Sequence, residues 1–367
     1  MTTAPEVAAA VQRLRPAAPP DKPLKVFLWP ADVNSGVWEY RIKMVRDELL
    51  RLGHEVQTSQ TLGAWPREEA DVIVGQRLCM TGPCAQWLIL AEQPRRPVLV
   101  YEVDDDLFNI DQRTNPNGAV FKQPNIRQNM IDAIRVADLV TVSTAPLADV
   151  LSRWNDNVVI LPNCVRAALL TTPAPLRRGK DDGRVIYGWQ GSATHADDWA
   201  IARPAVAELL ATDERFHLRM LGTPYFDGLP HPPDIAESRI TWTPWTADLA
   251  QHYRRVSRFD VSLAPLAPTA FNRSKSALRV IESYALGVPV VASDVPAYRG
   301  WVRPGMDGYL VKNAAQWREA MRFLADPDLR LDMGDVARER AADWTIEKNI
   351  HQWIEAYRAA VAGRVAA

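Results

Sequence analysis

The 367-residue chain has few cysteines, no long hydrophobic run and no large excess of charge of either sign. Cys79, Cys84 and Cys164 have no zinc-ligand spacing and cannot all pair, so we expect reduced thiols in a cytoplasmic protein. No apolar run approaches the ~20 residues of a membrane-spanning helix, and the N-terminus lacks the apolar segment of a signal peptide. Peripheral membrane association stays open. The net charge of −1 gives no electrostatic basis for tight nucleic-acid binding.

Apolar residues make up 47% of the chain and charged residues 24%, which is typical of globular proteins, and the length suits two domains. We expect a loosely ordered tail over residues 1–23, with one short helix across Val7–Leu14, and an N-terminal domain over 24–165. A linker rich in Pro, Thr, Arg and Gly follows over 166–183. A C-terminal domain over 184–344 completes the division, and a final helix covers 345–361.

Short β-branched runs alternate with helix-length segments in both halves, which predicts doubly wound α/β domains. In the N-terminal half the expected strands are Leu24–Trp29, Gly53–Val56, Asp71–Gly75, Pro97–Tyr101, Ala137–Ser143 and Val158–Pro162. In the C-terminal half they are Arg184–Tyr187, Phe216–Leu221, Arg239–Trp242, Phe259–Leu263 and Val288–Ala292. The principal expected helices are 38–52, 125–136, 146–153, 197–210, 249–258, 314–324 and 329–344.

The stretch from Phe271 to Gly300 carries most of the chemical information. We expect one helix there, capped by Asn272 or Ser274 and ended by Gly287. Its polar face would carry Lys275, Arg279 and Glu282, at positions i, i+4 and i+7. Two cations near a helix start favour a bound anion, and a carboxylate further along can accept hydrogen bonds from a sugar diol. A solvated face with an Arg–Glu pair is the alternative.

Two further sets of candidate residues follow predicted strands. Gly188–Ser192 is predicted as a loop that admits phosphate to its backbone at Gly191 and Ser192, with His195 close behind and Trp189 a candidate lining residue. Asp104, Asp105 and Asp106 follow the fourth strand, at the sheet edge where ligands bind. These carboxylates could bind a metal, cap a helix, orient a hydroxyl group or be solvated.

The motif from Lys275 to Ser293, "KS-x-LR-x-IE-x-x-x-x-G-x-P-V-V-x-S", resembles the nucleotide-sugar site of retaining GT-B glycosyltransferases, the class related to glycogen and sucrose synthases. Gly305–Val311 (GMDGYLV) and the run "ADLVTVS…VVILPN" resemble other parts of that class. The family often carries two glutamates eight positions apart, but Ser274 stands where the first would be. The segment Pro265–Ser276 resembles a subgroup with a "Phe-Asn-x-x-Lys-Ser" motif.

The resemblance implies two Rossmann-like domains facing each other across a cleft. The donor would lie against the C-terminal domain, with Glu282 on the ribose. Residues assigned to donor binding are Asn272, Arg273, Ser276, Gly191, Ser192 and Trp189; those assigned to catalysis are Lys275, Arg279 and His195. The acceptor side would comprise Asp104, Asp105, Asp106 and Gly36 of the first glycine-bearing loop.

The implied reaction transfers a sugar from a nucleoside-diphosphate donor to a hydroxyl group, with retention at the anomeric carbon and without a cofactor or bound metal. The acceptor would be a glycan, a lipid-linked group, a protein or a modified DNA base, the last two as in phage-type enzymes. A non-catalytic nucleotide-sugar-binding protein is the alternative, supported by Ser274 and by the absence of Arg and Lys from the loop at Gly191.

Overall fold

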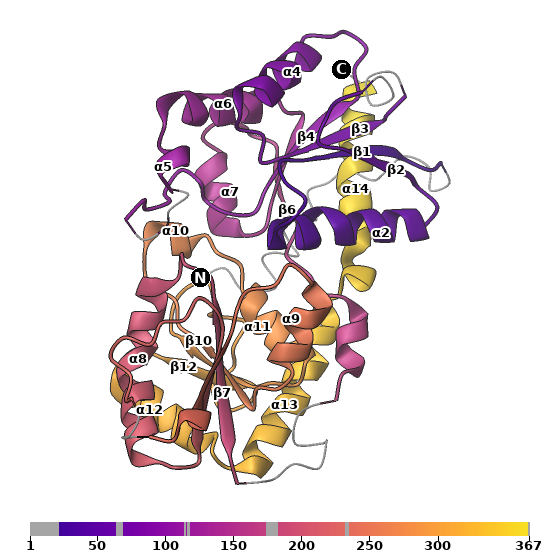
Figure 1. Cartoon of the computed structure of the whole chain (residues 1–367). Coiled ribbons are helices and arrows are strands. Elements are labelled where there is room, and N and C mark those ends of the chain that lie inside the picture. The colour runs from indigo at the N-terminus through magenta and orange to yellow at the C-terminus, as the bar shows by residue number, and fades with distance from the viewer. Residues whose placement is uncertain are drawn as a thin grey trace.

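The computed structural model describes residues 22–63, 69–113, 115, 118–173, 183–231 and 235–365. Within these residues the chain forms two α/β domains, one above the other in Figure 1, each built on a six-stranded parallel sheet. The predicted α/β fold class is therefore confirmed. The predicted helix across Val7–Leu14 and half of the predicted linker, residues 174–182, lie outside the described residues. Within the described part of the linker, 167–171 forms a 3₁₀ turn (η2, Ala167–Thr171).

The N-terminal sheet has the strand order β2-β1-β3-β4-β5-β6. Its strands are β1 (Lys25–Pro30), β2 (Glu55–Thr58), β3 (Val72–Gln76), β4 (Val98–Val103), β5 (Leu139–Val142) and β6 (Val158–Ile160). Its helices are η1 (Trp38–Lys43), α2 (Met44–Arg51), α4 (Thr81–Ala91), α5 (Gly118–Phe121), α6 (Pro124–Arg135) and α7 (Ala145–Leu151). The order reverses between β1 and β3, so the loops that follow these strands flank the crevice where such sheets bind ligands.

The C-terminal sheet has the order β12-β11-β10-β7-β8-β9, which reverses between β7 and β10. Its strands are β7 (Val185–Gly191), β8 (Phe216–Gly222), β9 (Ile240–Thr243), β10 (Val261–Ala264), β11 (Val290–Ser293) and β12 (Gly308–Val311). Its helices are α8 (Ala196–Thr212), η4 (Glu237–Arg239), α9 (Leu249–Val256), α10 (Ala270–Arg273), α11 (Leu278–Ala285), α12 (Ala314–Phe323), α13 (Pro327–Ala341) and η5 (Ala342–Trp344).

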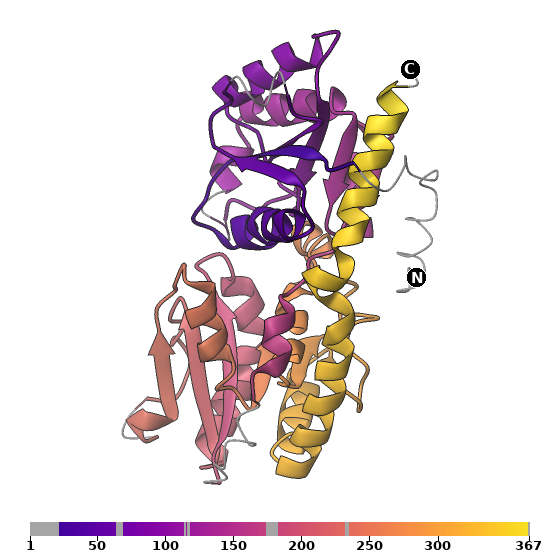
Figure 2. The same ribbon diagram turned by 90° about the vertical axis from the view of Figure 1, so that its right-hand side faces the viewer.

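The last helix, α14 (Ile346–Val365), runs from the C-terminal domain along the N-terminal one, as the yellow helix in Figure 2 shows. It packs against α2 and β4. The Arg41 guanidinium lies 5.8 Å from the ring centroid of Trp353, and Arg364 pairs with Asp138 at 3.3 Å. One apolar core cluster contains residues of both domains and of this helix, so burial of α14 holds the two domains together.

Three predicted elements differ in the structure. The single helix expected after Phe271 is two helices, α10 and α11, with Lys275 in the turn between them. Neither Asn272 nor Ser274 caps the N-terminus of a helix: Thr269 is the N-cap of α10, Ser274 is its C-cap, and α11 has no side-chain N-cap. The expected loop at Gly188–Ser192 is strand as far as Gly191, and α4 was not predicted at all.

Packing explains why β7 continues through its glycines. A Cβ atom at Gly188 would lie 2.0 Å from the Phe259 ring, and one at Gly191 would lie 2.4 Å from the Trp189 ring. Gly222, at the end of the neighbouring strand β8, has a φ of +103°. A Cβ atom at this position would lie 2.1 Å from the Gly191 carbonyl oxygen. These glycines are required by close packing around the sheet.

Candidate active site

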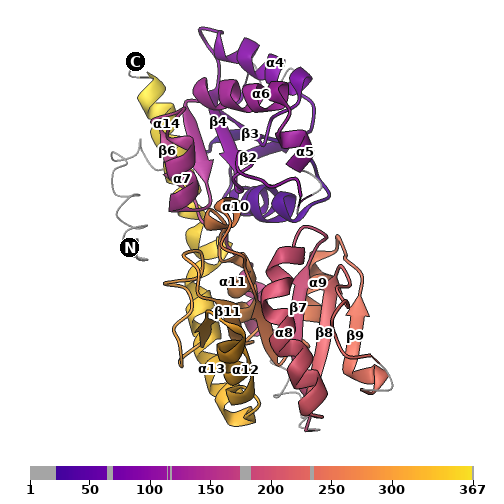
Figure 3. The same cartoon turned by 90° about the vertical axis from the view of Figure 1, so that its left-hand side faces the viewer.

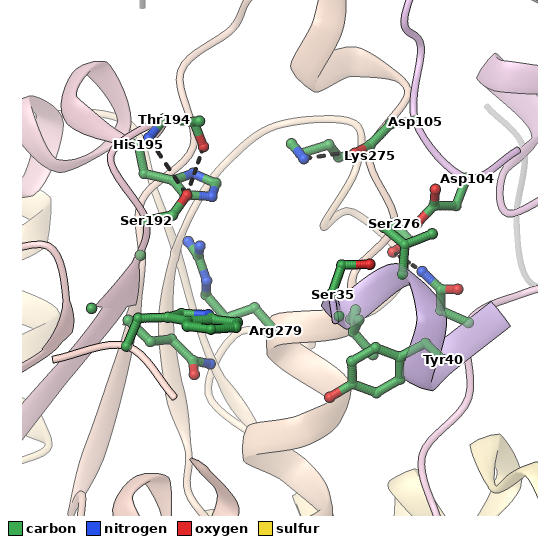
Figure 4. Close-up of a pocket in the computed structure, with 18 of the residues that line it drawn as sticks. Ser35, Tyr40, Asp104, Asp105, Ser192, Thr194, His195, Lys275, Ser276 and Arg279 are labelled. Carbon is green, nitrogen blue, oxygen red and sulfur yellow. Dashed lines mark hydrogen bonds and ion pairs between the residues drawn. The ribbon is translucent and has the colours of Figure 1, made fainter. Parts of the chain in front are cut away.

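A cavity of about 650 Å³ lies between the two domains. Figure 4 shows its two walls, with Ser192, Thr194 and His195 on one side and Ser35, Tyr40 and Asp104 on the other. The loops at both strand-order reversals reach it, because Ser35 and Gly36 follow β1 while Ser192 and His195 follow β7. Figure 3 shows the same boundary between the domains from the side, with α10 beside the N-terminal domain.

Arg279, near the start of α11, lines the cavity on the C-terminal side. Its Nη1 atom is buried and has no hydrogen-bond partner among the described residues. An unpaired buried guanidinium nitrogen is costly, so this atom lacks a partner that an anion in the cavity could supply. The position fits the predicted phosphate-binding role.

Glu282, one turn further along α11, lies at the cavity edge and is largely buried. Tyr40 from the opposite domain donates a hydrogen bond to its Oε1, and Gln190 Nε2 donates to its Oε2 at 3.4 Å. The Tyr40 and Tyr253 hydroxyl groups lie 2.7 Å apart. Burial, and then the negative charge of Glu282, raises the pKa of Tyr40 well above its ordinary value, so the phenol keeps its proton. Glu282, the residue predicted to bind the donor ribose, therefore already has hydrogen-bond partners from the protein in this structure.

Tyr40 and Arg41 are neighbours in the π-helical turn η1, and Tyr40 lines the cavity while Arg41 is buried in the domain core. Arg41 makes a bidentate pair with Glu102, at 2.7 and 3.1 Å, and donates to the Leu161 carbonyl. Local π-helical turns are frequent at functional sites. Here the turn anchors one side chain in the core and presents the next to the other domain.

His195 lies at the start of α8 and lines the cavity. Its Nδ1 is 2.7 Å from Asp198 Oδ2, and Asp198 Oδ1 accepts hydrogen bonds from the Ala267 amide and the Asn272 side chain. Burial lowers the pKa of His195, and Arg279 acts in the same direction. Although burial opposes it, hydrogen bonding holds the pKa of Asp198 below its usual value. The histidine is then neutral with Nδ1–H donating to Asp198, which leaves Nε2 as an acceptor.

Lys275 lies in the turn between α10 and α11 and pairs across the cavity with Asp105, at 3.2 Å from Nζ to Oδ1. Its ammonium group also lies 4.6 Å from the centroid of the Phe271 ring. Burial alone would raise the pKa of Asp105, but Lys275 and Arg77 outweigh it and the pKa is lowered. An ammonium group has three donors, so Lys275 can hold Asp105 and a second acceptor together.

Neighbouring residues also join this turn to the N-terminal domain. Asn163 Nδ2 donates to Ser276 Oγ at 2.8 Å, and Thr144 Oγ1 donates to the Ser274 carbonyl at 2.8 Å. Ser276 lines the cavity, whereas Ser274 is buried outside it. The residue that stands in place of a family glutamate thus serves the contact between domains.

Several predicted site residues do not line the cavity. Trp189 is fully buried in the domain core, with its ring 5.2 Å from that of Trp199. Arg273 is exposed, and Asn272 bonds Asp198 from behind the wall. Asp106 is buried and bonds Asn109. The structure brings the other predicted residues together: Lys275, Arg279, His195, Glu282, Ser276, Gly191, Ser192, Asp104, Asp105 and Gly36.

Other residues that line the cavity were not predicted from the sequence. Arg77 lies two residues after the predicted third strand and directly after the observed β3, so the rule that selected Asp104 could have selected it too. Gln190 lies inside the predicted loop Gly188–Ser192, but no role was predicted for it. Tyr40 and Trp245 belong to no recognisable sequence motif. They line the cavity only because the two domains come together. Among the described residues no group of three or more His, Cys, Asp or Glu side chains could hold a metal ion.

Comparisons with known proteins agree with this geometry. Residues 186–326 match the family model described as "Glycosyl transferases group 1". The sucrose-phosphate synthase of Thermosynechococcus elongatus superposes with a TM-score of 0.65 over 93% of this chain and 100% of that one, at 17% identity. HepE of Anabaena in complex with UDP gives 0.62, at 16% identity, over 90% and 98% of the two chains. The fold is GT-B.

A curated relative, the D-inositol 3-phosphate glycosyltransferase of Nocardia farcinica, is 33% identical over 172 residues. The match covers 43% of this chain and 36% of the relative. The chain spans less than half the length of the curated relatives it matches. In the part of the chain that the structure describes, no helix is both long enough and apolar enough to cross a membrane.

Proposed function

We propose that the protein is a glycosyltransferase that moves a sugar from a nucleoside-diphosphate donor to an acceptor hydroxyl group. The observation that carries the proposal is the buried Nη1 of Arg279 in the cavity, which has no hydrogen-bond partner in the described part of the chain and lies one helical turn from Glu282. A cation followed by a carboxylate matches, in order, the diphosphate and the ribose diol of such a donor. The glycosyltransferase family match over this domain and the UDP complex of HepE support the same substrate class.

We assign the roles as follows. Arg279 and Lys275 bind the diphosphate, and Glu282 accepts hydrogen bonds from the ribose once the Tyr40 hydroxyl has moved aside. Nε2 of neutral His195 carries no proton, so it can accept a hydrogen bond from a hydroxyl group of the donor's sugar but cannot donate one to a phosphate oxygen. Ser276, with the backbone at Gly191 and Ser192, completes the donor side.

The proposed reaction retains anomeric configuration by attack on the same face of the sugar. The bond from the anomeric carbon to the phosphate oxygen breaks, and a bond to the acceptor oxygen forms. The acceptor proton passes to the leaving phosphate oxygen. Lys275 and Arg279 stabilise the charge that grows on that phosphate. These cations supply the neutralisation that a metal gives elsewhere, so we propose metal-independent catalysis. Free Cys79, Cys84 and Cys164 support the proposed cytoplasmic location.

Titration calorimetry with UDP and with GDP, both in EDTA, tests the donor site. We expect wild-type protein to bind one of them and Arg279→Met to bind it at least about tenfold more weakly, since a hydrogen bond to a charged group is lost. Arg322→Met, an exposed change on α12, is the matched control and should bind as the wild type does. Binding of neither nucleotide, or equal binding by Arg279→Met, would refute the donor assignment.

A non-catalytic nucleotide-sugar-binding protein is the second candidate. The occupied carboxylate of Glu282 favours it, because both oxygens already accept hydrogen bonds from the protein. Nucleotide binding without release of sugar from any donor would select this candidate.

A further inference from the structure

The Asp198 carboxylate, behind the wall of the cavity, joins two segments of the C-terminal domain. Asp198 lies in the first turn of α8, is only 4% exposed and does not line the cavity. Its Oδ2 lies 2.7 Å from Nδ1 of His195, in the segment that follows β7. Its Oδ1 accepts hydrogen bonds from the Ala267 amide at 2.7 Å and from Asn272 Nδ2 at 2.9 Å, both in the segment that follows β10. One buried carboxylate therefore ties the start of α8 to the segment that leads to Lys275.

The hydrogen bonds of this carboxylate decide which ring nitrogen of His195 carries the proton. Although burial opposes ionisation, hydrogen bonding holds the pKa of Asp198 below its ordinary value, so the carboxylate accepts hydrogen bonds and donates none. The ring nitrogen that faces it, Nδ1, must then carry the hydrogen. Burial lowers the pKa of His195, which keeps the ring neutral. Nε2 is therefore the ring nitrogen without a proton.

The free lone pair of Nε2 matters because the charged side chains nearest to His195 in the cavity are donors. Burial, and then the charges of Arg279 and Lys275, lower the pKa of His195, so both cations act on its ring. All three side chains line the same cavity. Guanidinium and ammonium groups donate hydrogen bonds and accept none. A sugar hydroxyl group beside these cations has donors for its oxygen, while its own proton needs an acceptor.

We propose that Asp198 is a positioning residue that fixes His195 as the Nδ1–H tautomer and so keeps Nε2 as the acceptor for a hydroxyl group of the donor sugar. This assignment rests on the proposed transferase function and adds to it a residue that does not touch the donor. Figure 4 shows the His195 side chain at the cavity wall, beside Ser192 and Thr194.

Asp198→Asn gives a sharp test, because an amide has one acceptor oxygen where the carboxylate has two. The Ala267 amide and the Asn272 side chain both donate to this position, so the amide oxygen is expected to face them. The NH₂ group of the variant then faces His195 Nδ1 and needs an acceptor there. We expect the ring proton to move to Nε2, which reverses the tautomer while the size and shape of the buried side chain are kept.

Long-range ¹H–¹⁵N NMR spectra at pH 7.5 distinguish the two tautomers of a neutral histidine ring. The chain has six histidines, so the His195 signals are assigned by their loss in His195→Gln. We expect Nδ1–H in wild type and Nε2–H in Asp198→Asn. Asp197→Asn, an exposed change in the same turn of α8, is the matched control and should keep the wild-type tautomer. Nε2–H in the wild type would overturn the proposal whether or not the variant folds, as would the same tautomer in wild type and folded Asp198→Asn.

Calorimetric titration of the same proteins tests whether this acceptor serves the donor sugar. UDP is compared with UDP-glucose, and GDP with GDP-mannose. Asp198→Asn should bind the sugar nucleotide about two- to tenfold more weakly than wild type does, because one neutral hydrogen bond to the sugar is lost, and should bind the nucleoside diphosphate equally well. Unchanged affinity for the sugar nucleotide, or an equal loss of affinity for the nucleoside diphosphate, would overturn the role in sugar recognition. Failure of the wild type to bind any of the four ligands would count against the donor assignment, whereas the NMR spectra still decide the tautomer.

Discussion

At the scale of single residues, the cavity combines side chains whose partners are complete with others whose partners are missing. Lys275 and Glu282 already bond the opposite domain, whereas Arg279, Arg77 and Asp104 each retain a buried atom that has no partner among the described residues. The unpaired atoms mark where ligand groups are needed. The bonded residues must exchange or share a partner when a donor binds.

Glu282→Gln should weaken donor binding at least tenfold while the fold is kept. A carboxylate that accepts hydrogen bonds from a ribose contributes roughly 1.5–3 kcal/mol through each bond to a charged group, and the amide is nearly isosteric. Calorimetric titration with the nucleotide that wild type binds gives the comparison. Glu319→Gln, exposed on α12, is the control. Unchanged affinity in folded Glu282→Gln would remove Glu282 from the donor site.

Asp104→Asn should raise stability near neutral pH. Burial and then the neighbouring Asp105 raise the pKa of Asp104 from 3.8 to about 6, with Glu102 adding to the shift and Arg77 and Arg41 opposing it. Folding therefore favours the protonated form of Asp104, and the contribution of this residue to the free energy of unfolding falls as pH rises from about 4 to 6.

Above pH 6 the folded protein carries the full penalty for charge at Asp104, and Asn removes it. We expect the melting temperature of Asp104→Asn to exceed that of wild type at pH 7.5 and to approach it near pH 4. Thermal unfolding followed by circular dichroism at both pH values measures the difference. A lower melting temperature at pH 7.5 would show that the carboxylate stabilises the fold.

At the scale of elements, the period and composition of the sequence were enough to predict the described parallel strands except β12, and most of the described helices. Fully buried runs such as Val72–Gln76 and Val98–Val103 contain mainly β-branched residues, which is typical of parallel strands covered on both faces. Helix α4, which was not predicted, contains Gly82 and Pro83 among its first residues. A Gly-Pro pair is typical of a loop, so the sequence did not indicate a helix there. Its helical form depends on packing against α6.

The region around Lys275 could not be predicted to the same detail. Its angular pattern fits one continuous helix, yet the chain turns between α10 and α11 because Thr144 and Asn163 of the other domain bond the intervening residues. The glycines of β7 failed as predictors for a related reason. Their small size suits a phosphate loop and a closely packed strand equally well, and only the positions of Phe259 and Trp189 decide.

At the scale of the whole molecule, the domains meet through α14 and through polar contacts across the cavity. These contacts are Tyr40 with Glu282, Lys275 with Asp105, Asn163 with Ser276, and Thr144 with Ser274. None was predicted from the sequence, because each joins residues more than a hundred positions apart. The conformation described is therefore one in which side chains of the two domains already bond one another across the cavity.

Tyr40→Phe should tighten donor binding about tenfold or more. The Tyr40 hydroxyl and the donor ribose compete for Glu282 Oε1, and a hydrogen bond to a charged group contributes about 1.5–3 kcal/mol. Nucleotide titration of this variant beside wild type measures the change. Weaker binding would mean that the hydroxyl contacts the donor directly instead of occupying its site.

The most direct test of the central claim is turnover by folded Lys275→Met beside wild type, measured as nucleoside-diphosphate release from a panel of nucleotide sugars by mass spectrometry. Methionine keeps most of the length of the side chain and removes its charge. We expect wild type to consume at least one donor and the variant to turn it over about 100- to 1000-fold more slowly, the effect of losing one contact that stabilises the transition state. Donor affinity should fall much less, because Arg279 remains. Turnover within about threefold of wild type would contradict the account, since Lys275 would then have no part in the chemistry.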